Sequence, residues 1–215
     1  MEERAARDSV AAGYGTGGKS ETEVKSEAAA RAQGFFEEGY NCCQSVFLAF
    51  AKQYGFDRET ACRLSASFGG GVGRLRQICG AVSAMALVCG LETGAVEGAD
   101  QAAKAYNYEN VQQLAAQFEA QSGSLICREL LGLDQEGADK ELREKMQGGM
   151  GRHQPQARDE QYYATRPCKR LIGLAAEITQ KWLTDRSNAG QESKAQTKSN
   201  AGQKSEAQPK PNAEE

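Results

Sequence analysis

The chain has 215 residues and a formal net charge of −3, with 40% hydrophobic, 26% charged and 7% aromatic residues. This length fits one domain with tails, and the nearly balanced charge argues against a basic protein that binds nucleic acid or an anionic membrane surface. The unusual count is seven cysteines against one histidine.

Residues 1–21 carry few large apolar side chains, and we expect them to form a flexible leader. A GxxxxGKS sequence at residues 13–20 matches the phosphate-loop pattern, but the strand that a nucleotide-binding loop must follow is missing. No secretory signal precedes the domain, and the longest near-apolar run, residues 78–91, is shorter than the roughly 20 residues of a membrane span. We therefore expect no membrane insertion and a cytoplasmic location, where thiols stay reduced.

Residues 22–186 are expected to form one helical domain, and its first part predicts three helices. The first helix begins at Ser26 and ends before Gly39. Asn41 and Asp57 can cap the second and third helices through their side-chain oxygens. The third helix carries apolar residues on one side, namely Ala61, Leu64 and Phe68.

The second part of the domain also reads as helices. The glycine-rich segment 69–74 predicts a loop with exposed backbone, and the apolar run from residue 78 predicts a nearly fully buried helix. Residues 98–121 predict a long amphipathic helix. Ser124 can cap a short helix, and Pro167 can open the last one.

No run of residues alternates with a period of two, so the predicted fold class is all-α. Residues 187–215 contain no Val, Ile, Leu, Met, Phe, Trp, Tyr or Cys, and the sequence SNAGQ occurs twice in them. Such a segment buries too little apolar surface to offset the entropy of ordering it. We therefore expect a compact multi-helix bundle with disordered N- and C-terminal tails, the latter beginning at residue 187.

Four cysteines lie at or near the predicted start of a helix: Cys42, Cys79, Cys127 and Cys168. Free N–H groups and partial positive charge at a helix start favour the thiolate, so we expect lowered pKa values for these thiols. Basic residues close to them in the sequence would act in the same direction: Arg74, Arg76, Arg128, Lys169 and Arg170. The four cysteines are therefore candidate redox thiols and candidate metal ligands.

The other three cysteines are weaker candidates for redox thiols or metal ligands. Cys62 and Cys89 lie within apolar helical stretches and are expected to be small core residues, while Cys43 has at best a secondary role beside Cys42. No CxxC pair occurs, so the spacing matches neither a zinc ribbon nor a ferredoxin.

The pattern as a whole resembles a family of redox-active proteins named for the arrangement C…CGAxxG…C…C. The resemblance covers about residues 28–185, and it departs from the pattern at Ala84, where the family has glycine. It implies a small helical domain with four defining cysteines and a redox role, with iron–sulfur ligation as one use. The matching segments are FFEEGYNCCQ at 35–44, FGGGVG at 68–73, CGAVSA at 79–84, CRELLG at 127–132 and Cys168.

We expect electron transfer at the four cysteines, either as ligands of an iron–sulfur cluster or as dithiol/disulfide pairs. The alternative is a helical binding or structural module held by a zinc site with four thiolate ligands, and inert packing cysteines are a third interpretation. Whether the protein is an enzyme, which redox partner it uses and its oligomeric state stay open. Five glycines would let backbone approach a cofactor closely: Gly69, Gly70, Gly71, Gly73 and Gly80.

Overall fold

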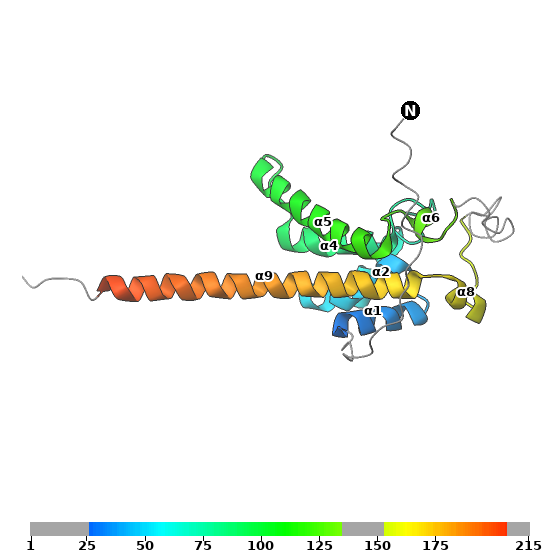
Figure 1. Cartoon of the computed structure of the whole chain (residues 1–215), viewed down its shortest axis with the longest axis horizontal. Coiled ribbons are helices and arrows are strands. Elements are labelled where there is room, and N and C mark those ends of the chain that lie inside the picture. The colour runs from blue at the N-terminus through cyan, green and yellow to red at the C-terminus, as the bar shows by residue number, and fades with distance from the viewer. Residues whose placement is uncertain (1–25, 135–152, 206–215) are drawn as a thin grey trace, which may run out of the picture.

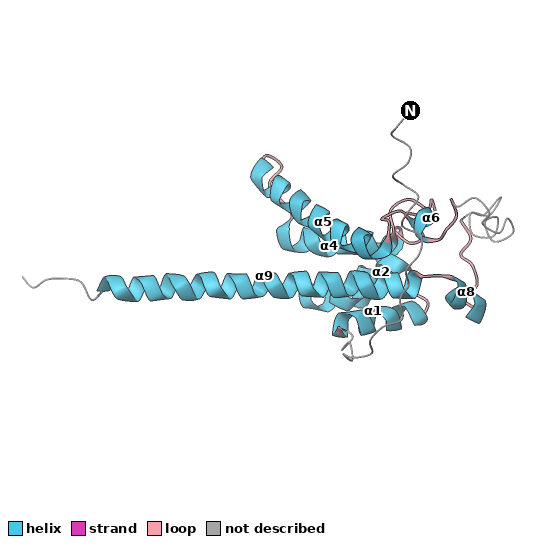
Figure 2. Cartoon of the chain, in the orientation of Figure 1, coloured by secondary structure: helices cyan, strands magenta, loops and turns pink. Residues whose placement is uncertain are grey.

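The computed structural model describes residues 26–134 and 153–205, with side chains described as far as residue 189. These residues form helices and no strand, which confirms the predicted all-α class (Figures 1 and 2). The predicted leader and the GxxxxGKS sequence lie outside the described residues. The elements are α1 (Glu27–Glu37), α2 (Cys42–Ala51), the 3-10 helix η1 (Lys52–Tyr54), α3 (Arg58–Ala66), α4 (Gly80–Thr93), α5 (Gln101–Ser122), α6 (Cys127–Leu130), α8 (Glu160–Thr165) and α9 (Cys168–Ser205).

Side-chain caps start the first three α-helices, and the caps at Asn41 and Asp57 agree with the prediction. The backbone N–H of Ala29 donates to the Ser26 side chain at the start of α1. Asn41 accepts from two backbone N–H groups of α2, while the side chain of Gln44 accepts from the Asn41 N–H, which completes a capping box. Asp57 caps α3 in the same way. Local sequence signals therefore define where these helices begin.

The hydrophobic core lies between α1, α2, α4 and α9, and α5 packs on α4 and α9. The largest fully buried side chains include Phe36, Met85, Leu114 and Phe118. Figure 1 shows α9 running across the bundle, with α4 and α5 on one side and α1 on the other. The short helices α6 and α8 gather at the end where α9 begins, so several chain segments meet there.

Three local predictions differ from the structure. Leu64 is 50% exposed, because α3 turns Ala61 and Ser65 toward the core instead. The helix from residue 78 begins at Gly80 and is less buried than expected, since Leu91 on its outer face is 42% exposed. Ser124 stands two residues before the N-cap of α6, where its hydroxyl accepts from the N–H of Ile126 and stabilises the turn.

Helix α9 continues to Ser205, past the boundary that the composition placed after residue 186. Extending a helix that is already formed needs no new nucleation, and the alanine, glutamine, lysine and glutamate residues of this segment favour the helical backbone. Residues 206–215 of the predicted tail lie outside the described residues. Among the described helices, none combines the length and apolarity that crossing a membrane requires.

Candidate functional site

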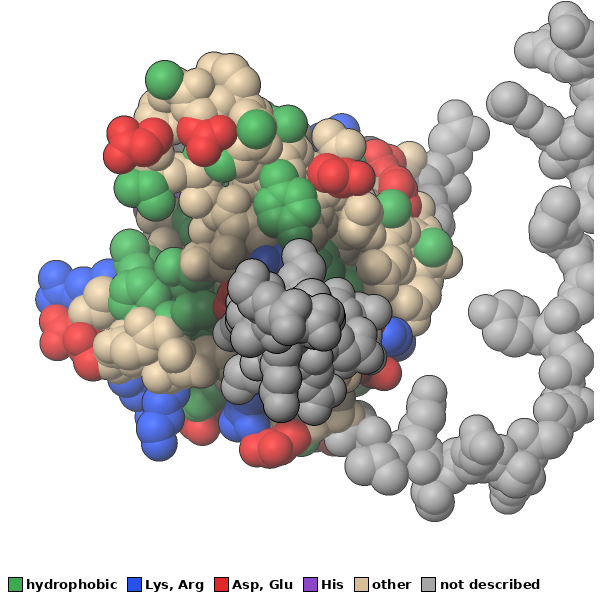
Figure 3. Space-filling view, turned by 90° about the vertical axis from the view of Figure 1, so that its left-hand side faces the viewer, with side chains coloured by type: hydrophobic (Ala, Val, Ile, Leu, Met, Phe, Trp, Pro, Cys, Tyr) green, Lys and Arg blue, Asp and Glu red, His purple; other side chains and the backbone are tan. Residues whose placement is uncertain are grey.

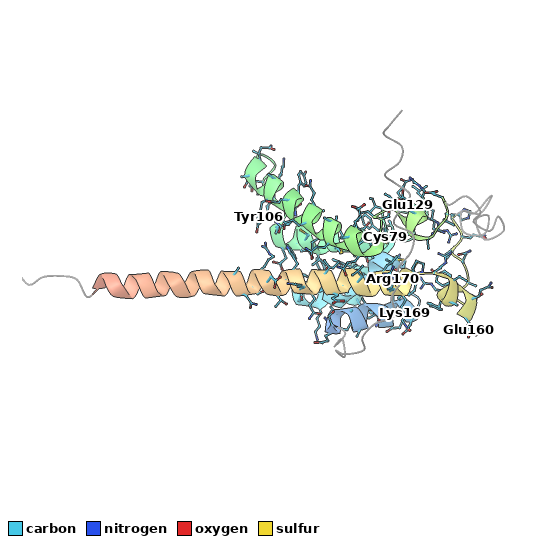
Figure 4. All side chains as sticks on the ribbon, viewed as in Figure 1. Cys79, Tyr106, Glu129, Glu160, Lys169 and Arg170 are labelled. Carbon is cyan, nitrogen blue, oxygen red and sulfur yellow. The ribbon has the colours of Figure 1, made fainter. Side chains whose placement is uncertain are left out.

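The four cysteines singled out by the sequence all stand at helix starts, as predicted. Cys42, Cys127 and Cys168 are the first residues of α2, α6 and α9, and Cys79 is the N-cap of α4. The fold brings them to one end of the bundle, where Figure 4 labels Cys79 near the start of α9. Electrostatic interactions connect Cys42 with each of the other three thiols. Residues 126 positions apart in the chain thus form one cluster.

A short antiparallel bridge between Ile78 and Ile126 positions two of these cysteines. The N–H of Cys79 donates to the carbonyl of Leu125 at 2.8 Å, and the N–H of Cys127 donates to the carbonyl of Gln77 at 2.6 Å. Because side chains alternate along such extended segments, Cys79 and Cys127 lie on the opposite side of the bridge from the two isoleucines. The bridge therefore turns both thiols toward the same region.

Glycines allow the segments that carry the cysteines to approach each other closely. A Cβ at Gly71 would lie 2.7 Å from the Cβ of Cys127, and one at Gly80 would lie 3.2 Å from the Cβ of Cys42. A Cβ at Gly69 would come within 2.6 Å of the Asn41 side chain. At Gly69 and Gly71 these distances are shorter than real Cβ contacts, and at Gly80 the Cβ would also lie 2.9 Å from the carbonyl oxygen of Phe68. A side chain at any of the three would therefore displace its neighbours around the thiols.

The loop between α3 and α4 adopts a left-handed backbone over most of its length. Gly70, Gly71 and Gly73 have positive φ, and so do three residues with side chains, Val72 (58°), Arg74 (65°) and Arg76 (61°). Each of the latter costs about 1–2 kcal/mol relative to right-handed backbone. The loop carries the buried guanidinium of Arg76 to the cysteines, with its Nη1 4.0 Å from the Sγ of Cys127. Gly70 lies against Arg74, whereas a Cβ at Gly73 would contact nothing within 4 Å.

The ionisations of Cys42 and Cys168 depend on each other. Donation from the Cys42 thiol lowers the pKa of Cys168 to about 7 against the opposing effect of burial, and the positive charges of Arg166, Arg76 and Arg158 act in the same direction. The same hydrogen bond, together with burial, raises the pKa of Cys42 well above its ordinary value. Near neutral pH the pair therefore combines one thiolate with one thiol.

For the other cysteines of the cluster, the predicted lowering of the pKa is wrong. Burial raises the pKa of Cys79 to about 12, although backbone N–H groups of α4 oppose the change. Burial also raises the pKa of Cys127, despite the nearby charge of Arg76, and that of Cys43 to about 12. The free energy lost by removing a thiolate from water is therefore larger here than the stabilisation that a helix start and one nearby cation provide.

Cys62 and Cys89 lie apart from this cluster. Cys89 is fully buried, and its Sγ lies 3.5 Å from the hydroxyl of Thr93 in α4. Cys62 is half-buried at the edge of the core in α3. The prediction of a core role is confirmed for Cys89 and holds in part for Cys62. All seven cysteines are free thiols in this structure.

Three further residues that interact electrostatically with the thiols escaped the sequence analysis: Arg158, Tyr162 and Arg166. The aromatic pair at 162–163, flanked by arginines within a polar segment, is the signal that could have found them. Three of the basic residues that the sequence places near the thiols either form ion pairs with carboxylates or lie exposed to solvent. Arg128 pairs with Asp134, Lys169 pairs with Glu37 and Arg170 is exposed.

The donor chemistry of the four cysteines suits both an iron–sulfur cluster and zinc, since thiolates ligate both. However, within residues 26–134 and 153–205 no group of three or more Cys, His, Asp or Glu side chains is arranged to hold a metal ion. The described arrangement thus provides a pair of interacting thiols with two further thiols nearby, and not a formed ligand cage.

Comparison with known proteins adds one finding to this geometry. The family described as "Putative redox-active protein (C_GCAxxG_C_C)" matches residues 40–182. The matched range contains all four cysteines at the helix starts. No curated protein and no solved structure gives a significant match.

Proposed function

The chain belongs to this C_GCAxxG_C_C family, whose description names redox activity, and we propose that its chemistry is thiol–disulfide exchange at Cys42 and Cys168. The observation that carries the proposal is the position of the two thiols at the starts of α2 and α9, where their interaction raises the pKa of Cys42 and lowers that of Cys168. A thiolate is the reactive form of cysteine, and it attacks best when its pKa lies near the ambient pH. Cys42 then serves as the resolving thiol.

The reaction balances in two steps. The Cys168 thiolate attacks one sulfur of a substrate disulfide R–S–S–R′, so that a Cys168–S–S–R bond forms and R′S⁻ leaves. Cys42 loses its proton and attacks the Sγ of Cys168, which forms the Cys42–Cys168 disulfide and releases RS⁻. Overall, the protein pair, which starts as one thiolate and one thiol, gives up two electrons and one proton. The substrate disulfide becomes one thiol and one thiolate, and the thiolate can take a second proton from solvent. A thiol reductant returns the protein pair to its starting state.

The environment of the pair supports this division of roles. Cys168 lies among three arginines, which stabilise its thiolate before attack and after release. Cys42 keeps its proton at neutral pH and so does not compete as the attacking group. Cys42 is also half-buried and Cys168 is 9% exposed, so both sulfurs of the pair are largely covered by protein.

Ligation of an iron–sulfur cluster by the same four cysteines is a second candidate function. It is supported by the mutual electrostatic interactions of Cys42, Cys79, Cys127 and Cys168, which come from four separate helix starts. A zinc site with these thiolates would serve a binding or structural module instead.

Anaerobic purification followed by iron, zinc and acid-labile sulfide assays separates the three functions. For the exchange reaction we expect metal-free protein that loses two thiols per chain under a mild oxidant, with a disulfide between Cys42 and Cys168 in peptide mapping. Cys89→Ser is the matched control, because Cys89 is buried away from the cluster, and it should oxidise like the wild type. Stoichiometric iron and sulfide would instead support the cluster, zinc would support the structural site, and metal-free protein without this disulfide would refute the exchange reaction.

A further inference from the structure

Two arginines near the thiol pair, Arg158 and Arg166, contact the same aromatic ring, that of Tyr162. Neither of them takes part in the bond changes of the exchange reaction. The Cζ of Arg166 is 4.4 Å from the ring centroid of Tyr162. The Cζ of Arg158 is 5.2 Å from the same centroid and 4.6 Å from that of Phe36. Tyr162 interacts electrostatically with both Cys168 and Cys42. The two guanidinium groups and the ring thus form one unit at the thiols.

The polar partners of these two arginines are neutral. Arg158 donates to the carbonyls of Phe36 at 3.1 Å and Tyr40 at 2.9 Å, and Arg166 donates to the side-chain oxygen of Gln156. Across the side chains of residues 26–134 and 153–189, no carboxylate pairs with either of them. Both side chains are half-buried. Both guanidinium groups interact electrostatically with Cys168, whose thiolate supplies balancing negative charge near them.

The exchange reaction removes this balancing charge. When the Cys168 sulfur enters a disulfide, it becomes neutral, and two half-buried guanidinium groups keep their positive charges. Guanidinium groups bind carboxylates through paired, charge-assisted hydrogen bonds. A substrate that carries carboxylates would replace the lost charge at the step where it is lost. Figure 3 shows the opposite end of the bundle, where acidic, basic and hydrophobic side chains are interspersed.

We propose that the thiol pair acts on anionic disulfides of low molecular weight, whose carboxylates bind Arg158 and Arg166 next to Tyr162. The inference rests on the thiol–disulfide exchange proposed above and names its substrate class. A small substrate fits an attacking sulfur that is only 9% exposed, and a negative charge fits the two guanidinium groups. Neutral and cationic disulfides of the same size would react more slowly.

The test compares two probes of the reduced full chain, in a Cys62→Ser background that removes the other partly accessible thiol. The probes are the dianionic 5,5′-dithiobis(2-nitrobenzoate) and the uncharged 4,4′-dithiodipyridine, and each rate constant is divided by that of N-acetylcysteine with the same probe. We expect the normalised rate to favour the anionic probe about tenfold at low salt, and the preference to shrink as salt rises. Since both probes react with the same thiolate, a changed pKa of Cys168 cancels in the ratio.

Variants assign the preference to the two arginines. Arg158→Gln and Arg166→Gln should each reduce the anionic preference several-fold, whereas Arg170→Gln, on the exposed face of α9, should leave it unchanged. Arg166→Gln removes no hydrogen bond to backbone, so it stays informative if Arg158→Gln fails to fold. An unchanged ratio in Arg166→Gln, or reaction with both probes without preference, would overturn the substrate class and leave the exchange reaction standing. Reaction no faster than N-acetylcysteine with either probe would refute the exchange reaction itself.

Discussion

The substitution Gly71→Ala, which adds one methyl group, should distinguish the energetic cost of close packing at the thiols from the cost of a left-handed backbone in the loop. The new Cβ would lie 2.7 Å from the Cβ of Cys127 and 2.8 Å from the backbone nitrogen of Gln77, at a φ of +72°. The left-handed backbone costs about 1–2 kcal/mol with a side chain. Overpacking in a tight site costs about 1–3 kcal/mol more. We therefore expect Gly71→Ala to lower the free energy of unfolding by about 2–5 kcal/mol.

Gly73→Ala is the matched control, because it lies in the same loop with a φ of +55° but its Cβ would contact nothing within 4 Å. It should lower the free energy of unfolding only by the backbone term, about 1–2 kcal/mol. Both variants can be measured by urea unfolding of the reduced protein, monitored by circular dichroism. Equal losses in the two variants would refute the packing of Gly71 on Cys127. A larger loss at Gly71 should also bring altered oxidation of the cluster, since Cys127 must move.

Three further predictions follow from the site. The rate at which iodoacetamide alkylates Cys168 should rise with pH and reach half its maximum at about pH 7, because the thiolate is present above the lowered pKa and is lost below it. Peptide mapping after alkylation at a series of pH values measures this rate. A midpoint near the pKa of an ordinary thiol would contradict the prediction. Cys42→Ala should raise the pKa of Cys168 and trap the mixed disulfide with 5,5′-dithiobis(2-nitrobenzoate), which mass spectrometry detects; release of the second thiol at the wild-type rate would count against Cys42 as the resolving group. Asn41→Ala should lower the free energy of unfolding by about 1 kcal/mol, because the cap of α2 is lost. An unchanged urea unfolding curve would show that Asn41 does not stabilise the start of α2, where Cys42 lies.

Predictions from the sequence succeed where the signal lies within one helical turn. Asn41 and Asp57 cap their helices because a side-chain oxygen reaches N–H groups two or three residues ahead. The same local geometry places the four cysteines at helix starts. The sequence fails at Leu64, because the face of α3 that becomes buried depends on how α3 packs against α2.

The pKa values show the limit of local reasoning most clearly. A helix start favours a thiolate at each of the four cysteines, yet only Cys168 has a lowered pKa. Desolvation depends on everything that packs around a sulfur, and that is a property of the assembled bundle. The thiol partner of Cys168 is likewise set by the fold, since Cys42 is 126 positions away in the chain.

The sequence by itself therefore determined the all-α class, the caps of α2 and α3 and the placement of four cysteines at helix starts, because each depends on hydrogen bonds and periodicity within a few residues. Only the tertiary structure decided that Cys42 and Cys168 form the pair, that burial keeps Cys79 and Cys127 protonated, and that Arg158 and Arg166 stand beside the pair. Those outcomes depend on contacts between distant segments and on exclusion of water, and neither quantity is encoded in any short stretch of the chain.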